Sequence, residues 1–175
     1  MHIQTNRLTL QPVRVDSLED LVRLLTDPIV GKTYMVPDFA NEVAAYTLAE
    51  RIRELSQNPE KFVLGIYLGN RLIGLMNETD ISGDSIEVGY AIRSDLHGCG
   101  FATEALAAGI AYLFTAGYNQ VKAGAFEDNT ASIRVMEKCA MTRLPQTDEI
   151  AYRGQIHRCV YYGIGREHSE SLQTQ

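Results

Sequence analysis

The 175-residue sequence contains no apolar run near the roughly 18 residues that would indicate a transmembrane helix. Its first residues, Met1 to Gln4, lack the apolar segment of a secretion signal. The three cysteines, Cys99, Cys139 and Cys159, have no C-x-x-C spacing, and the four histidines have no metal-ligand spacing. We therefore expect a cytoplasmic protein with reduced thiols, no bound metal and no membrane partner.

The sequence also lacks an excess of positive charge. It has 16 Lys and Arg residues against 22 Asp and Glu residues, which gives a formal net charge of −6. This charge repels a nucleic-acid backbone, and no basic stripe interleaved with aromatic residues is present. A nucleic-acid partner is therefore not expected, and a cationic or amine-bearing partner suits the charge better.

No internal repeat, linker or shift in composition divides the chain. Its length fits one domain, which buries about two-thirds of the surface of the unfolded chain. We expect a single domain over residues 1–166 and a polar C-terminal tail over residues 167–175.

In the first part of the chain, turn and cap signals separate the predicted elements. Ser17 to Asp20 is typical of a capping box at a helix start, and Asp27-Pro28 ends that helix. Ala45, Leu48, Ile52 and Leu55 repeat at helical spacing and predict a second helix. The expected order is a strand over residues 7–12, a helix from 17 to 26, a loop over 31–39 and a helix over 41–58.

The remainder of the chain predicts antiparallel hairpins followed by a half in which strands and helices alternate. Short glycine-containing connections join three apolar runs, as in hairpins. A glycine-rich loop then leads into a helix. The expected elements are strands over 62–68, 72–79 and 85–92, a loop over 95–102, a helix to 116, a strand over 120–126, a helix over 129–139 and a strand over 157–164. The fold class is therefore mixed α/β.

The loop before the helix at residue 101 could bind an anion. Gly98 and Gly100 allow backbone N–H groups to converge on an anion at the positive end of the helix dipole. A tight turn would use the same glycines. A nicotinamide-binding loop would need a third glycine where Thr103 stands, although Glu127 and Asp128 could serve as its ribose-binding acid. A Walker loop is excluded because no Gly-Lys-Ser/Thr follows.

Four sequence blocks, in order, resemble the GNAT superfamily of N-acetyltransferases, and within it the RimJ/RimL-like branch of ribosomal-protein N-terminal acetyltransferases. The blocks are Thr5-Asn6-Arg7-Leu8-Thr9-Leu10, Ile86-Glu87-Val88-Gly89-Tyr90-Ala91-Ile92, Gly98-Cys99-Gly100-Phe101-Ala102-Thr103-Glu104-Ala105-Leu106 and Asn129 to Lys138. The resemblance implies a seven-stranded mixed, largely antiparallel sheet that splays between its fourth and fifth strands, with about four flanking helices. It also implies acetyl-CoA as cofactor, with its pantetheine in the splay and its pyrophosphate on the glycine loop.

The resemblance also implies which residues bind the cofactor. They are Tyr90, Ala91, Ile92, Gly98, Cys99, Gly100, Phe101, Ala102, Thr103, Asn129 and Lys138. Two departures from the family pattern are Asp95, where Arg or Gln is usual, and Ala140-Met141, where Gly-Phe is usual. Asp95 would repel a diphosphate unless its side chain turns away.

A base and an acid are needed, because a protonated amine cannot attack a thioester and the thiolate must be protonated as it leaves. Alternation over residues 85–92 puts Glu87 on a face with Gly89 and Ala91, which leaves room for a ligand. Glu87 is therefore the predicted base, although it could simply be a solvated strand residue. Ser132, in the first turn of the last helix, is the predicted acid, or else a helix cap. Tyr90 is an alternative acid, or a core ring.

We thus expect an enzyme in which an amine attacks acetyl-CoA directly. The acceptor could be a protein N-terminal α-amine, or a small amine such as a polyamine, an amino acid or an aminoglycoside. A non-catalytic acyl-CoA sensor is a further alternative. In the enzyme, the acceptor site is expected to be formed by residues 31–39 and 144–155, both interpreted as irregular. Exposed sheet edges make a homodimer possible.

Overall fold

The computed structural model describes residues 1–167, so most of the predicted polar tail, residues 168–175, lies outside the described residues. The contacts group the chain into two compact units. The N-terminal unit comprises Met1–Glu78 and Tyr90–Ala105, and the C-terminal unit comprises Thr79–Gly89 and Leu106–Gln175. No helix within residues 1–167 is long and apolar enough to span a membrane.

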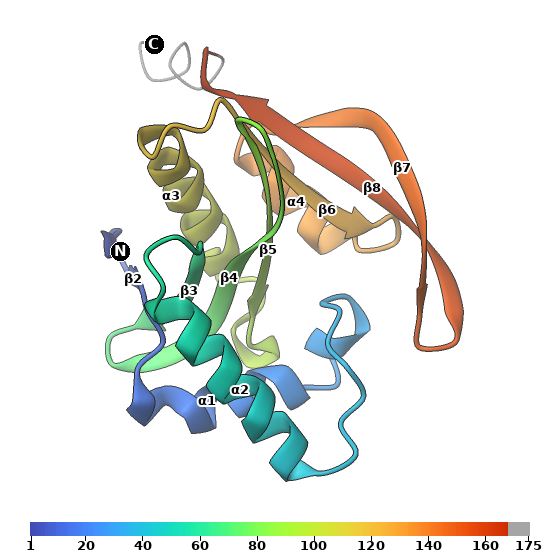
Figure 1. Cartoon of the computed structure of the whole chain (residues 1–175). Coiled ribbons are helices and arrows are strands. Elements are labelled where there is room, and N and C mark those ends of the chain that lie inside the picture. The colour runs from blue at the N-terminus through green and yellow to red at the C-terminus, as the bar shows by residue number, and fades with distance from the viewer. Residues whose placement is uncertain (168–175) are drawn as a thin grey trace. The chain divides into compact units, whose positions relative to one another are not determined.

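The described residues form a mixed sheet and four α-helices (Figure 1). The helices are α1 (Leu18–Thr26), α2 (Glu42–Gln57), α3 (Phe101–Thr115) and α4 (Thr130–Lys138). The strands are β1 (Ile3–Gln4), β2 (Leu8–Gln11), β3 (Val63–Leu68), β4 (Arg71–Ser82), β5 (Ser85–Ile92), β6 (Gln120–Phe126), β7 (Thr142–Tyr152) and β8 (Gln155–Gly165), in the sheet order β1-β2-β3-β4-β5-β6-β8-β7. The predicted fold class is confirmed, and the two-residue β1 adds an eighth strand to the seven expected.

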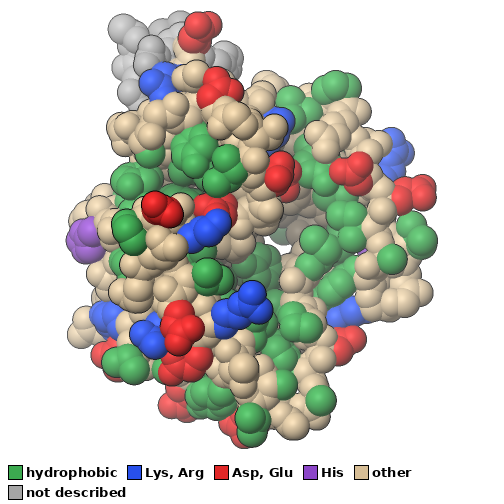
Figure 2. Space-filling model, in the orientation of Figure 1, with side chains coloured by type: hydrophobic (Ala, Val, Ile, Leu, Met, Phe, Trp, Pro, Cys, Tyr) green, Lys and Arg blue, Asp and Glu red, His purple; other side chains and the backbone are tan. Residues whose placement is uncertain are grey.

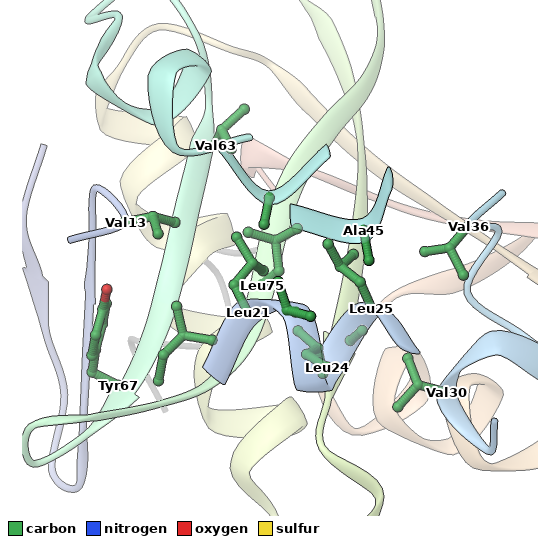
Figure 3. Packing of buried hydrophobic residues seen from close by; sticks show 14 residues of the cluster. Val13, Leu21, Leu24, Leu25, Val30, Val36, Ala45, Val63, Tyr67 and Leu75 are labelled. Carbon is green, nitrogen blue, oxygen red and sulfur yellow. The ribbon is translucent and has the colours of Figure 1, made fainter. Parts of the chain in front are cut away.

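In the N-terminal unit, α1 and α2 pack on β3, β4 and the end of β5 (Figure 1). Leu21, Leu24 and Leu25 lie on one face of α1 and are at most 2% exposed, because their spacing directs all three side chains to the core. They contact Ala45 of α2 and Leu75 of β4 in one apolar cluster (Figure 3). This cluster fixes the helices on the sheet from which the glycine loop extends.

The predicted helix boundaries in this unit agree with the structure. The helix α1 ends at Thr26, before the Asp27-Pro28 pair. The Asn41 side chain caps α2 by accepting a hydrogen bond from Ala44 N at 3.0 Å. Of the four apolar residues that predicted α2, Leu55 in the last turn of the helix is 39% exposed, whereas Ala45 is fully buried.

In the C-terminal unit, β6 lies between β5 and β8 and buries alternate residues, Val121, Ala123 and Ala125. The helix α4 covers this buried face, and Tyr162 of β8 bonds Glu137 of α4 at 3.4 Å. By the period of two along a strand, Glu87, Lys122 and Gly124 belong to the opposite face. The side chain proposed as base is therefore on the face without α4.

The parallel pairing of β5 with β6 covers the start of the two strands. It runs from Ser85↔Gln120 to Glu87↔Lys122, although β6 continues to Phe126. Among the described residues of the C-terminal unit, Val88 and Gly89 have no register partner on β6. The pairing of β5 with β6 therefore ends at Glu87. These are the two strands for which the family resemblance implies a splay.

The interpretation of residues 144–155 as irregular was wrong. Most of this range belongs to β7 and β8, which form a long hairpin (Figure 1). The turn uses Arg153 and Gly154, both with positive φ angles, 50° and 74°. Because β7 is an edge strand whose side chains are mostly exposed, it carries no alternation of apolar residues. The sequence signal for a strand was therefore missing.

Candidate active site

The predicted site residues belong to both units. The N-terminal unit contains the end of β5 and the glycine loop, which carry Tyr90, Ala91, Ile92, Gly98, Cys99, Gly100, Phe101, Ala102 and Thr103. The C-terminal unit contains Glu87, Asn129, Ser132 and Lys138.

The glycine loop has the backbone that its sequence predicts. Gly98 and Gly100 have φ angles of 78° and 80°, a region that favours glycine. Glu104 N donates to Gly100 O at 3.1 Å, which is the first helical hydrogen bond of α3. The N–H groups of a first helical turn have no acceptor within the helix, and the helix dipole adds positive potential there. The loop is therefore fitted to bind an anion such as a diphosphate.

Asp95, the departure from the family pattern, is held by an arginine. Arg93 donates two hydrogen bonds to the Asp95 carboxylate, both of 3.0 Å. These bonds lower the pKa of Asp95. The carboxylate is therefore ionised, but a guanidinium beside it offsets its charge, so its repulsion of a diphosphate is reduced.

The end of β5 differs from the predicted alternation. Ala91 is 7% exposed and belongs to the apolar cluster under α1 and α2, so its side chain leaves no open space for a ligand. Ile92 is also buried, whereas Tyr90, interpreted as a core ring, is only partly buried. In the N-terminal unit this strand therefore buries consecutive residues at its end, and Ala91 and Ile92 are candidates for cofactor contact through their backbone alone.

Glu87 has the features expected of a general base. It is partly buried, and Thr79 Oγ1 donates a hydrogen bond to its Oε1 at 2.9 Å. Burial raises the pKa of Glu87, and the nearby Asp80 and Asp148 act in the same direction. The Thr79 hydrogen bond and Lys122 oppose the rise. A carboxylate with a raised pKa is a better proton acceptor than an ordinary one.

Two other carboxylates, Glu78 and Glu127, accept hydrogen bonds from cations. Glu78 accepts from Lys61 Nζ at 2.8 Å and from Phe62 N at 2.9 Å. Glu127 accepts from Arg143 Nη2 at 2.9 Å. Because both are paired with cations, they are weaker candidates than Glu87, whose hydrogen bond comes from a hydroxyl.

The start of α4 places two predicted residues one turn apart. Asn129 Oδ1 accepts from Ser132 N at 3.2 Å, so Asn129 is the helix cap, as expected, and Ser132 is not. Ser132 is partly buried. Lys138 and Arg134 are exposed on the same helix. Their predicted contacts with a cofactor remain predictions.

Sequence reasoning missed two groups of residues. In the N-terminal unit, Thr5 and Arg7 bond the carboxylate of Glu104 in α3. In the C-terminal unit, the Tyr161 side chain lies against Gly124 and forms hydrogen bonds with Asp148 and Cys159. The block containing Thr5 and Arg7 was a sign of the family, but nothing in the sequence indicates its partner 97 residues away.

Comparison with known proteins identifies the class. The family described as acetyltransferase (GNAT) domain matches residues 7–142, so the chain belongs to this family and is an acetyltransferase. This confirms the predicted acetyl-CoA-dependent class of enzyme.

Individual relatives agree with this assignment. The chain is 27% identical over 146 residues to an uncharacterised N-acetyltransferase p20 of Bacillus licheniformis, covering 81% of this chain and 82% of the relative. A GNAT-family acetyltransferase structure from Bacillus anthracis superposes with a TM-score of 0.82 at 24% identity, covering 95% and 99% of the two chains. RimL, a ribosomal L7/L12 α-N-protein acetyltransferase solved with coenzyme A, gives a TM-score of 0.82 at 16% identity, covering 94% and 98%.

Proposed function

We propose that the chain transfers an acetyl group from acetyl-CoA to a protein or peptide N-terminal α-amine by direct attack, with Glu87 as the general base. The observation that carries this proposal is the Glu87 carboxylate, which is partly buried, has a raised pKa and accepts a hydrogen bond from the Thr79 hydroxyl. It lies where the pairing of β5 with β6 ends, so the strand beyond it has backbone groups to offer a bound ligand.

In this mechanism Glu87 accepts the proton of the ammonium, either directly or through a water molecule, which gives the nitrogen a lone pair for attack. Backbone N–H groups of β5 beyond Glu87 polarise the thioester carbonyl. Ser132 donates a proton to the departing thiolate and takes up the second proton lost by the acetylated nitrogen, so that coenzyme A leaves as the free thiol. The glycine loop and the first turn of α3 bind the diphosphate.

The proton balance supports an α-amine as acceptor. An α-amino group has a pKa of about 7.7 to 8.0, whereas a lysine ammonium has one of about 10.4. A carboxylate therefore removes a proton from an α-ammonium more easily, by more than two pKa units. The structural similarity to RimL agrees with this choice, and the net charge of −6 favours any cationic acceptor.

The test compares acceptors by thiol detection of released coenzyme A. Acetyl-CoA is supplied with one of three acceptors. They are short peptides with free N-termini, the same peptides with acetylated N-termini and an internal lysine, and spermidine. We expect turnover with the free N-termini and little with the other acceptors. Preferential turnover of spermidine or of the lysine peptides would overturn the α-amine assignment.

Two variants then test the assigned roles. Glu87→Gln should lower kcat with the preferred acceptor by about 10²- to 10⁴-fold, the usual effect of losing a general base. Ser132→Ala should lower kcat modestly and leave acetyl-CoA affinity nearly unchanged, since a leaving-group donor acts in the transition state. Wild-type kcat in Glu87→Gln would contradict the base assignment.

A further inference from the structure

Residues near the N-terminus contact the start of α3 through one carboxylate. Thr5 Oγ1 and Arg7 N donate to Glu104 Oε1 at 2.6 and 2.8 Å, and Arg7 Nε donates to Glu104 Oε2 at 2.6 Å. The Glu104 side chain is 17% exposed. Although burial alone would raise it, these hydrogen bonds bring the pKa of Glu104 below its ordinary value. The ionised carboxylate thus fixes Arg7 against the helix.

The same Arg7 guanidinium contacts the glycine loop. Arg7 Nη1 donates to Cys99 O at 3.0 Å, and the guanidinium carbon lies 4.5 Å from the centroid of the Phe101 ring. A Cβ atom built on Gly100 would lie 3.4 Å from Arg7 Nη2. Arg7 therefore contacts the residues on both sides of Gly100, Cys99 and Phe101.

The hydrogen bond to Cys99 O sets the direction of the next amide. The peptide bond between Cys99 and Gly100 is planar and trans, so its C=O and N–H point in opposite directions. Because Arg7 holds the carbonyl oxygen, the N–H of Gly100 points away from Arg7. Because Gly100 has no Cβ, its backbone restrains the orientation of this peptide less than another residue would, so the hydrogen bond from Arg7 is a contact that can fix it.

We propose that Arg7 is a positioning residue for the diphosphate of acetyl-CoA. By holding Cys99 O, Arg7 turns the Gly100 N–H toward that anion. The proposal rests on the proposed role of the glycine loop as diphosphate site. Arg7 acts through geometry more than through charge, because Glu104 neutralises it. One planar guanidinium reaches both the carboxylate and the carbonyl, and an ammonium has no such fork.

The test compares two acetyl donors, acetyl-CoA and acetylpantetheine, which lacks the diphosphate. In Arg7→Ala, kcat/KM for acetyl-CoA should fall about 10- to 100-fold through KM, the range expected for losing a charge-assisted hydrogen bond. The value for acetylpantetheine should stay at the wild-type level. Arg7→Lys, which keeps the charge, should recover only part of the loss. Arg23→Ala, which removes an exposed pair with Glu19, is the matched control.

The outcomes separate the inference from the proposed function. Equal losses with both donors, no loss with either, or full activity in Arg7→Lys would each overturn the positioning role of Arg7. Gly100→Ala tests the loop itself, because its φ of 80° is strained for alanine. If Gly100→Ala does not lower activity selectively with acetyl-CoA, the diphosphate assignment fails. If it does and the Arg7 variants do not, only the inference fails.

Discussion

At the scale of single residues, the proposed catalytic role of Glu87 comes with a cost in stability. Its pKa is raised mainly because it is partly buried, so the folded chain holds this proton more tightly than the unfolded chain does. The free energy of unfolding should therefore fall as pH rises from the ordinary carboxyl pKa through the raised one. The ionised Glu87 carboxylate thus weakens the fold, which is a cost that groups with perturbed pKa values often carry at functional sites.

Glu87→Gln should separate these two effects. At pH 7 the variant should unfold at the same or a higher temperature than the wild type, because the desolvated charge is gone. Its rate should be low at neutral pH and recover partly in alkaline buffer, where more of the amine is already neutral. Thermal unfolding and initial rates from pH 6 to 10 measure both. A rate deficit that does not change with pH would assign Glu87 a structural role.

Thr79→Val tests the hydroxyl that bonds Glu87. The Thr79 hydrogen bond lowers the pKa of Glu87, so its loss should raise that pKa further. The acidic limb of the profile of kcat/KM against pH should then move to higher pH. The maximum value of kcat/KM on the plateau of this profile should change little. Thr47→Val, on the exposed surface of α2, is the control. An unmoved limb would show that Glu87 is not the group that titrates in the rate.

At the scale of elements, two helices begin with the same asparagine cap, and only one cap lies in the candidate site. Asn41 and Asn129 each accept the hydrogen bond of the residue three positions later. Removing either cap should cost about 1 kcal/mol of stability. The pair therefore offers an internal comparison between a simple cap and a cap that is also predicted to bind the cofactor.

Asn129→Ala should weaken acetyl-CoA binding, whereas Asn41→Ala should lower only the melting temperature. Calorimetric Kd values and thermal unfolding of the two variants measure this difference. The reason is that the resemblance to the family predicts a contact between Asn129 and pantetheine. Equal acetyl-CoA affinity in both variants would leave Asn129 with the capping role alone.

The sequence predicted elements well where the signal is local. The apolar spacing of α2 and the stop before Pro28 set helix ends within one or two residues, but the predicted capping box is wrong in detail, because the Ser17 side chain forms no cap hydrogen bond. Strand β7 was missed because an exposed edge strand has no apolar period. The contact of Arg7 with Glu104 was missed because the pairing is set by the fold and not by spacing. Ala91 was placed on the open face because strict alternation does not hold at the end of β5.

At the scale of the whole molecule, the net charge of −6 acts on both substrates with opposite signs. Basic and acidic side chains are interspersed on the face shown in Figure 2, so the effect expected is one of overall charge. Acetyl-CoA is anionic and should be repelled, while a cationic acceptor should be attracted.

Raising ionic strength from 0.05 to 0.5 M should therefore lower kcat/KM for a dicationic peptide acceptor and raise it for acetyl-CoA. The Debye length is about 10 Å at 0.1 M and shorter at higher salt, so both long-range effects should be screened in this range. Steady-state rates with one substrate varied at a time measure the two slopes. Slopes of the same sign would indicate a general effect of salt on the enzyme.

The position of Cys99 gives the molecule a natural reporter of occupancy. Cys99 is exposed on the glycine loop, whereas Cys159 is buried and burial raises the pKa of Cys139 to about 11. A thiol reagent should therefore label Cys99 first, because thiolate fraction and access control reactivity. Acetyl-CoA on the loop should slow this labelling in a concentration-dependent way, as followed by intact-mass spectrometry. Donor affinity could then be titrated before any acceptor is known, and a Cys99→Ser chain would supply the blank.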